Sequence, residues 1–133
     1  MLDPVFQTLA EVIEIHSDQI RRYGGHAAVR DQGLLESALA QPEASFAGEW
    51  LHQDAFTMAA AYTYHICQNH PFIDGNKRAG LACALVFLEM NGVKLLDAKS
   101  RLEKAVLRLS SGEMTKLALS ALFERLAENP RRK

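Results

Sequence analysis

Residues 70–92 read HPFIDGNKRAGLACALVFLEMNG, a short polar loop followed at once by an apolar run. Pro71 disfavours helical backbone in the residue before it, so a preceding helix should end there. The segment from Leu81 to Leu88 is apolar on every helical face, which is typical of a helix surrounded by protein. Asn91-Gly92 is a good left-handed helix stop. The stretch therefore predicts a buried central helix from about Asn76 to Asn91, with the polar loop at its N-terminus.

Helical patterns also cover most of the chain on either side of this stretch. Amphipathic or helix-forming segments are expected over residues 4–22, 31–42, 54–69, 97–109 and 114–126. Asp31 and Asp54 stand where helix N-caps are expected. Residues 42–53 have no sustained period, and they predict an irregular surface segment that could lie over a site. No strand pattern is longer than a few residues, so the sequence predicts an all-α fold.

The composition fits one compact domain over residues 1–133. Of the 133 residues 48% are hydrophobic, which is enough to build one core. The net charge of −1 gives no general electrostatic reason to expect a nucleic acid or an anionic membrane as partner. The first residues lack the layout of a secretion signal and the apolar run is too short to cross a bilayer, so we expect a cytoplasmic protein. Cys67 and Cys83 are expected to be buried thiols.

Two cations, Lys77 and Arg78, stand in the first turn of the central helix. The helix dipole is positive there, so each cation costs about 0.3 to 1 kcal/mol unless something offsets it. Free backbone N–H groups at the same end favour a phosphate, and Gly75 lets the backbone approach a ligand or adopt a positive φ. Asn76 can either cap the helix or donate its amide to a phosphate oxygen. We therefore interpret the loop and the helix start as an anion-binding site.

Two other residues of the loop have side chains suited to catalysis. Asp74 offers a carboxylate beside the phosphate site, which is how proteins usually hold Mg²⁺, together with water and the phosphates of the substrate. His70 is expected to be extended before Pro71, and its ordinary pKa of about 6.5 suits a general base. Phe72 and Ile73 are expected to anchor the loop to the core. Each residue alone is more often structural, so the interpretation depends on their joint occurrence.

Two familiar kinds of site do not match the loop. It is not a phosphate-binding P-loop, because Lys77 is not followed by Ser or Thr and no strand precedes it. It is a poor zinc site, because His65 and His70 are five residues apart and do not share a helical face as the two histidines of a zinc-binding helix would. The remaining histidines, His16, His26 and His52, are expected to be structural or exposed groups, as is His65. Arg30-Asp31 is expected to anchor a loop locally.

The run from His70 to Arg78 resembles the signature loop of the Fic family, and specifically its death-on-curing (Doc) branch of toxins. Weaker similarity extends over most of the chain, from Ile15-His16 to Asn91-Gly92. The resemblance implies an all-α fold of about six helices with an active-site loop at residues 70–78. It also implies site roles for these residues. His70 would be the general base, Asp74 the magnesium-linked carboxylate, Lys77 and Arg78 catalytic phosphate-binding cations, and Phe72, Gly75 and Asn76 further parts of the nucleotide site.

Two positions separate this chain from most Fic enzymes, which typically transfer the AMP part of ATP to a protein hydroxyl. Such enzymes have a glycine at the position of Lys77 and an arginine at the position of Leu81. Both departures resemble Doc, in which ATP binds in the reverse sense and the γ-phosphate is transferred. The resemblance therefore implies ATP and Mg²⁺ as cofactors. It implies a Ser or Thr of a translation factor as target, with elongation factor Tu the leading candidate, and arrested growth as the outcome. AMP transfer stays an alternative.

A toxin of this type also requires an inhibitor. Self-inhibited Fic proteins carry a Ser or Thr, three residues, and then Glu followed by Gly or Asn, whereas here the run from Ser120 to Glu124 is followed by Arg125. The resemblance therefore implies a small antitoxin encoded nearby, which inserts a helix over an exposed part of the site. A catalytically silent module that binds nucleotide or antitoxin is a further alternative.

Overall fold

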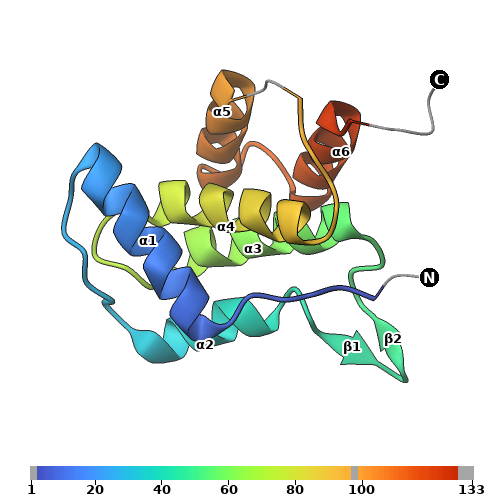
Figure 1. The fold of residues 1–133 in the computed structure, drawn as a ribbon, viewed down its shortest axis with the longest axis horizontal. Helices are drawn as coiled ribbons and strands as arrows, with labels where there is room; N and C mark the ends of the chain where they lie inside the picture. Colours follow the sequence, from blue (N-terminus) through green and yellow to red (C-terminus); the bar gives the residue numbers. More distant parts are fainter. Residues whose placement is uncertain (1–2, 97–98, 129–133) are drawn as a thin grey trace.

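The computed structural model describes residues 3–96 and 99–128, and within these ranges the chain forms six helices and one small hairpin (Figure 1). The elements are α1 (Leu9–Tyr23), α2 (Gln32–Ala40), β1 (Ser45–Phe46), β2 (Glu49–Trp50), α3 (Ala55–Asn69), α4 (Asn76–Met90), α5 (Lys99–Ser110) and α6 (Lys116–Leu126). The predicted all-α fold of about six helices is confirmed. The predicted helix over 97–109 begins with Asp97 and Ala98, which lie outside the described residues. No helix in the described ranges is long and apolar enough to cross a membrane.

Helices α3 and α4 form the centre of the fold and pack along each other (Figure 1). The close approach is made possible by Gly80, which has no side chain where α4 faces the backbone of α3. A Cβ atom placed on Gly80 would lie 3.1 Å from the carbonyl oxygen of Thr63 and 3.3 Å from its Cα. The hydroxyl of Thr63 donates a hydrogen bond of 3.0 Å to the Gly80 carbonyl. Gly80 is therefore a packing contact between the two central helices.

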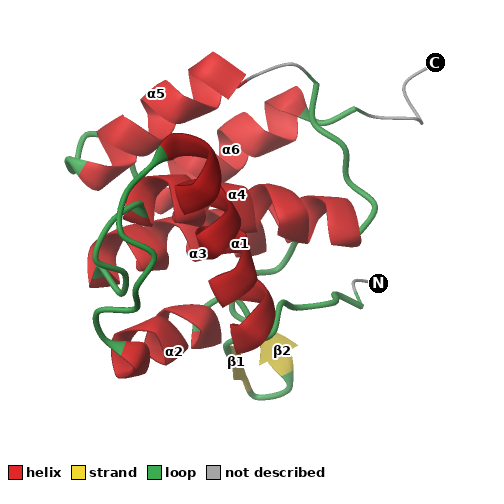
Figure 2. Cartoon of the chain, turned by 60° about the vertical axis from the view of Figure 1, so that its left-hand side comes forward, coloured by secondary structure: helices red, strands yellow, loops and turns green. Residues whose placement is uncertain are grey.

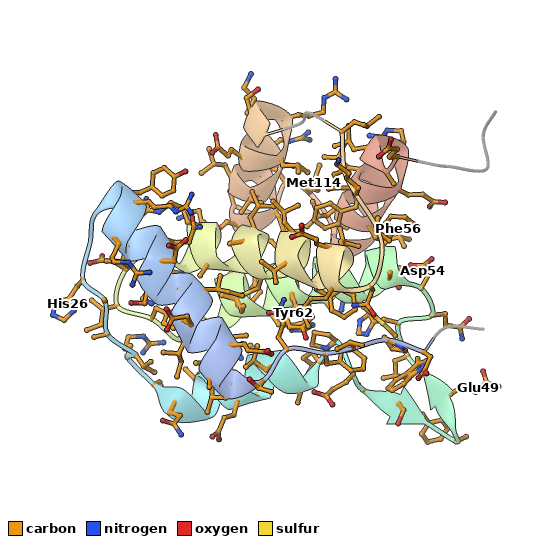
Figure 3. All side chains as sticks on the ribbon, viewed as in Figure 1. His26, Glu49, Asp54, Phe56, Tyr62 and Met114 are labelled. Carbon is orange, nitrogen blue, oxygen red and sulfur yellow. The ribbon has the colours of Figure 1, made fainter. Side chains whose placement is uncertain are left out.

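The other helices cover the central pair on several sides. Helix α1 lies in front of α3 and α4 in Figure 2. In Figure 1, α2 packs on α3 from below, and α5 and α6 cover the central pair from above. The core that they enclose includes Tyr62, Phe87 and Phe123. Tyr62 lies between the helices in Figure 3. The predicted buried thiols are confirmed: Cys67 and Cys83 are free and buried, and burial raises the pKa of Cys67 to about 11.

The predicted start of the first helix, at residue 4, was wrong, because α1 begins at Leu9. Thr8 and Glu11 form a capping box, in which the Thr8 hydroxyl accepts from the Glu11 N–H and the Glu11 carboxylate accepts from the Thr8 N–H. The preceding residues are fixed by other elements, since the Val5 N–H donates to the Asn91 side chain at 2.7 Å. The N-cap roles predicted for Asp31 and Asp54 are confirmed.

The segment between α2 and α3 is more regular than predicted. It contains a β-hairpin that pairs Ser45 with Trp50 and Phe46 with Glu49 and that projects from the helices (Figure 1). Both turn residues, Ala47 (φ 55°) and Gly48 (φ 81°), have positive φ, as the tightest hairpin turns require. The prediction of an irregular segment missed this turn because only one of its two central residues is a glycine.

A cluster of His52, His65 and Lys116 attaches the chain after the hairpin to α3 and α6. The Lys116 Nζ lies 3.2 Å from Nε2 of His52 and 3.2 Å from Nε2 of His65. Burial, and secondly the Lys116 ammonium, lower the pKa of both imidazoles, that of His65 to about 4. Neutral imidazoles can accept hydrogen bonds from the ammonium, whereas protonated ones would repel it.

This cluster predicts a loss of stability in acid. The folded pKa of His65 lies below its ordinary value of 6.5, so between about pH 6.5 and 4 the unfolded chain binds more protons and unfolding is favoured as the pH falls. His65→Gln keeps an acceptor for Lys116 but does not titrate. The wild type should lose free energy of unfolding between pH 7.5 and 5, and in His65→Gln about 1 kcal/mol of that loss should be absent. This figure is reduced for solvent screening. Urea unfolding across this range measures it. His26→Gln, at an exposed histidine, should follow the wild type, and parallel curves for wild type and His65→Gln would refute the assignment.

The packing at Gly80 gives a second prediction. Alanine is normally better than glycine inside a helix by about 1 kcal/mol, but the new methyl group would overlap the Thr63 backbone, and overpacking costs about 1 to 3 kcal/mol. Gly80→Ala should therefore lower the free energy of unfolding by about 1 to 2 kcal/mol in chemical denaturation. Gly33→Ala in α2, where the new atom meets only the Asp31 side chain at 3.4 Å, is the matched control and should be neutral or stabilising. Equal effects of the two variants would contradict the packing role.

Candidate active site

The polar loop of residues 70–75 joins α3 to α4, and its first residue ends α3. His70 is the C-cap, with φ 49° and ψ 54°, so the predicted extended conformation of His70 was wrong. The helix end accounts for the difference, because the His70 N–H still donates to Ile66 and a left-handed residue is a common way to leave a helix. The Arg30 guanidinium then caps the exposed carbonyls, with Nε at 2.7 Å from His70 O and Nη2 at 3.1 Å from Asn69 O.

The connection between α1 and α2 holds the loop along its length. The Pro71 carbonyl accepts from the N–H groups of Arg30 (2.7 Å) and Asp31 (3.1 Å), and Ile73 donates to the Ala28 carbonyl (3.1 Å). The predicted anchoring role of Arg30-Asp31 is confirmed. His26 lies on the same connection, at the left-hand edge of Figure 3.

Phe72 and Ile73 have different roles, although both were predicted to be anchors. Phe72 is 1% exposed, and its ring stacks on the His16 ring with centroids 3.7 Å apart. Ile73 is 50% exposed, so its predicted anchoring role was wrong. Phe72 pairs with Val29 in an isolated β-bridge, and successive side chains of extended backbone point to opposite sides. Phe72, which was also expected in the nucleotide site, supports the loop from inside.

Asn76 closes the loop through its side-chain amide. Its Oδ1 accepts from the Phe72 N–H at 3.0 Å, and its Nδ2 donates to the Phe72 carbonyl at 2.9 Å and lies 3.3 Å from Nδ1 of His70. The capping alternative for Asn76 was wrong, because Gly75 is the N-cap and α4 has no side-chain cap. The backbone N–H groups of the first turn of α4 are therefore left for another acceptor.

Gly75 and Asp74 are held against α1. Gly75 has φ 77°, a conformation that favours glycine, and a Cβ atom there would lie 3.2 Å from Cδ1 of Ile20, so a larger residue would also have to displace that side chain. The Asp74 carbonyl lies 2.8 Å from Nε2 of the buried His16, whose pKa is lowered mainly by burial. This agrees with the structural role expected for His16, although its contact with the loop was not foreseen.

The Asp74 carboxylate is exposed and partly bound. Its Oδ2 accepts from the His26 N–H at 2.9 Å, and within the described ranges no hydrogen bond engages Oδ1. No group of three or more His, Cys, Asp or Glu side chains in those ranges could hold a metal ion. A single carboxylate with one available oxygen fits Mg²⁺ that takes its other ligands from water and phosphate.

The two cations at the start of α4 have different surroundings. Nη2 of Arg78 donates to the Gly24 carbonyl at 2.9 Å, and the guanidinium lies 5.5 Å from the centroid of the Tyr23 ring. Gly24 caps the C-terminus of α1, where the dipole is negative, so this contact offsets the cost of Arg78 without a ligand. Lys77 is exposed and forms no ion pair with a described residue. The argument from helix dipoles for a bound anion therefore applies to Lys77 more than to Arg78.

A groove of about 810 Å³ opens beside these cations, and we call it the α4–α5 groove. Its polar end is formed by Gly75, Asn76, Lys77 and Arg78 with Gln19 and Tyr23 of α1. Its apolar end includes Leu81, Leu85, Leu102 and Val106. The volume lies within the usual range for small-molecule sites. The sequence did not reveal the groove, because an all-apolar α4 predicted a helix covered on every side, whereas Leu81 and Leu85 are only half-buried.

Comparisons with known proteins agree with this geometry. The model of the Fic/DOC family matches residues 6–88 of the chain. The chain is 42% identical over 73 residues to the "Toxin Doc" of Mycolicibacterium smegmatis, which covers 55% of this chain and 56% of that protein. It is 33% identical over 116 residues to the "Protein kinase doc" of Escherichia phage P1, which covers 87% of this chain and 90% of that protein. The matched region contains the whole loop and most of α4, and the chain belongs to the Fic/DOC family.

Proposed function

We propose that this chain is the toxin of a toxin–antitoxin pair and a protein kinase that transfers the γ-phosphate of ATP to a Ser or Thr of a translation factor, with elongation factor Tu the leading candidate. The observation that carries the proposal is the N-terminus of α4, which has no side-chain cap, adjoins His70 and Asp74, and carries Lys77, for which no ion pair is found among the described residues. Such a helix end binds phosphate through its free N–H groups and its dipole. The names of the two relatives support the class of protein.

In this proposal, different residues of the chain bind the phosphates, hold Mg²⁺ and accept the proton of the attacking hydroxyl. The first-turn N–H groups, Lys77 and Arg78 would bind the phosphates and stabilise the charge that develops on them. Gly75 allows the phosphates to approach the backbone. Asp74 would hold Mg²⁺, which neutralises phosphate charge when it is bound. Because the loop is fixed by α1 and the α1–α2 connection, these groups are positioned before the substrate arrives.

His70 would take the proton of the attacking hydroxyl. Its side chain is exposed, and Asn76 approaches only Nδ1, so Nε2 has no hydrogen-bond partner among residues 3–96 and 99–128. A base at Nε2 requires the tautomer that is protonated at Nδ1. In that tautomer the Nδ1–H and the Asn76 amide N–H would face each other as two donors across the 3.3 Å contact, so the His70 ring would have to turn away from Asn76 when Nε2 acts as the base.

AMP transfer, as in most Fic enzymes, is the second candidate. Lys77 favours phosphorylation, because it places an ammonium group at the helix start where those enzymes have glycine. Leu81 favours it as well, because it contributes an apolar side chain to the groove where those enzymes have arginine. A third possibility, a silent binding module, is disfavoured by the joint presence of His70, Asp74 and Asn76.

The α4–α5 groove is the surface that we propose for the antitoxin. It combines an apolar floor from α4 and α5 with the cations of the active site, and amphipathic helices bind to grooves of this kind. A helix in the groove would cover the polar end, where the phosphates would bind. Inhibition would then follow from direct obstruction.

The reaction is tested with ATP labelled at either the γ- or the α-phosphate, in a translation extract to which the pure protein is added. We expect γ-label on one translation factor and none from the α-position. His70→Ala should lower the transfer rate by a factor of about 10² to 10⁴, the usual contribution of a general base, while the melting temperature stays unchanged. His26→Ala, at an exposed histidine beside the loop, is the control. Label from the α-phosphate would establish AMP transfer instead, and full activity of His70→Ala would remove the proposed base.

The antitoxin surface is tested with Leu107→Lys. Leu107 lines the groove and is 58% exposed, so the substitution should leave stability within about 0.5 kcal/mol of wild type. Affinity for the antitoxin encoded beside this chain should fall about tenfold or more, as measured by calorimetry. Leu117→Lys on α6, where the leucine is 72% exposed and outside the groove, should bind as the wild type does. If both variants bind normally, the antitoxin uses another surface.

A further inference from the structure

A second cavity of about 290 Å³ lies between α3, α6 and the chain that follows the hairpin. It is lined by Leu51, His52, Gln53, Thr57, Lys116, Leu117 and Ser120. It shares no lining residue with the α4–α5 groove. The loop of residues 70–75 contributes nothing to it, so the proposed transfer reaction leaves it without a role.

The Lys116 ammonium in the wall of this cavity lacks an opposite charge. Its contacts are the Nε2 atoms of His52 and His65 and the ring of Tyr64, whose centroid lies 5.5 Å away. No carboxylate of residues 3–96 or 99–128 forms an ion pair with it. The carboxylate of Asp54 is bonded to the N–H and hydroxyl of Thr57. Of the three protons on Nζ, two can be donated to the imidazoles, which leaves one for a ligand.

The position of Lys116 in its helix increases the need for an anion. Lys116 is the first residue of α6, where the dipole is positive, and Thr115 caps only the Ala118 N–H with its side chain. The N–H groups of Lys116 and Leu117 have no partner within the helix. An ammonium group and free N–H groups therefore adjoin the same cavity.

The edges of the cavity are apolar. Leu51 and Leu117 both line it and are 60% and 72% exposed. We propose that this cavity binds a small organic monocarboxylate, whose carboxylate pairs with Lys116 and whose short apolar part lies against Leu51 and Leu117. The size supports a small ligand, because 290 Å³ is at the lower limit of ordinary small-molecule sites.

The imidazoles explain why one negative charge is expected at neutral pH, and how binding should depend on pH. Burial and the nearby ammonium lower the pKa of His52 and His65, so Lys116 is the cation of the cluster at neutral pH, although burial lowers the pKa of Lys116 as well. A bound carboxylate would raise the pKa of both imidazoles, because an opposite charge favours their protonated form. By linkage, affinity should increase as the pH falls from neutral toward the lowered pKa values of the two imidazoles. Tyr64 faces the same ammonium through its ring.

The test uses butyrate as probe and the imidazole ring protons of His52 and His65 in NMR spectra as local reporters. Titration should move both signals and saturate, with a dissociation constant about threefold or more lower at pH 5.5 than at pH 7.5. Lys116→Met should weaken binding about tenfold or more. Lys104→Met, on the exposed side of α5, is the matched control and should bind as the wild type does. Ring signals in Lys116→Met that keep their dispersion show that the variant is folded.

Two further arms test the chemical class. Leu117→Ser should weaken butyrate binding more than acetate binding, because acetate has almost no apolar part to lose. Inorganic phosphate at equal ionic strength should move the ring signals less than butyrate does. Ring signals that do not saturate with butyrate, equal binding by Lys116→Met, or a phosphate response as strong as that of butyrate would each overturn the proposal.

Discussion

The contact between the backbones of α3 and α4 at Gly80 and Thr63 is the constraint on which the other features depend. It brings the end of one helix and the start of the next close enough for a loop of six residues to join them. The loop must then turn sharply, and it does so with a left-handed residue at each end, His70 and Gly75. The exposed polar groups of the site are therefore gathered at one place because two buried helices approach each other closely at Gly80.

The loop owes its shape to residues far from it in the sequence. The Pro71 carbonyl and the Ile73 N–H bond to the α1–α2 connection, and His16 supports Asp74 and Phe72 from α1. The Arg30 guanidinium donates hydrogen bonds to the carbonyls of Asn69 and His70 at the C-terminal end of α3. Damage to this connection should disturb the site as much as damage to the loop itself, although the connection presents no catalytic group.

The central part of the fold was predictable from sequence because its signals are local. The proline at residue 71, the glycine at residue 92 and the aspartates at residues 31 and 54 each act on their own backbone, and the helices end or begin where these residues predict. The site residues were likewise recognisable as a set from His70 to Arg78. What could not be predicted depends on tertiary contacts. The amide of Asn76 bonds within the loop rather than capping the helix, Ile73 faces solvent because Phe72 pairs with Val29, and one side of α4 stays half-covered because α5 stands away from it.

The contact between Arg78 and Gly24 joins the start of α4, where a phosphate would bind, to the C-terminus of α1. The same guanidinium that would bind a phosphate also completes the end of α1. The guanidinium has five N–H groups, so it could bind a phosphate while Nη2 keeps its bond to the Gly24 carbonyl, and occupancy of the site would then be coupled to the order of the α1 terminus. The backbone N–H groups in the last turn of α1 would then exchange their hydrogens more slowly when nucleotide is bound.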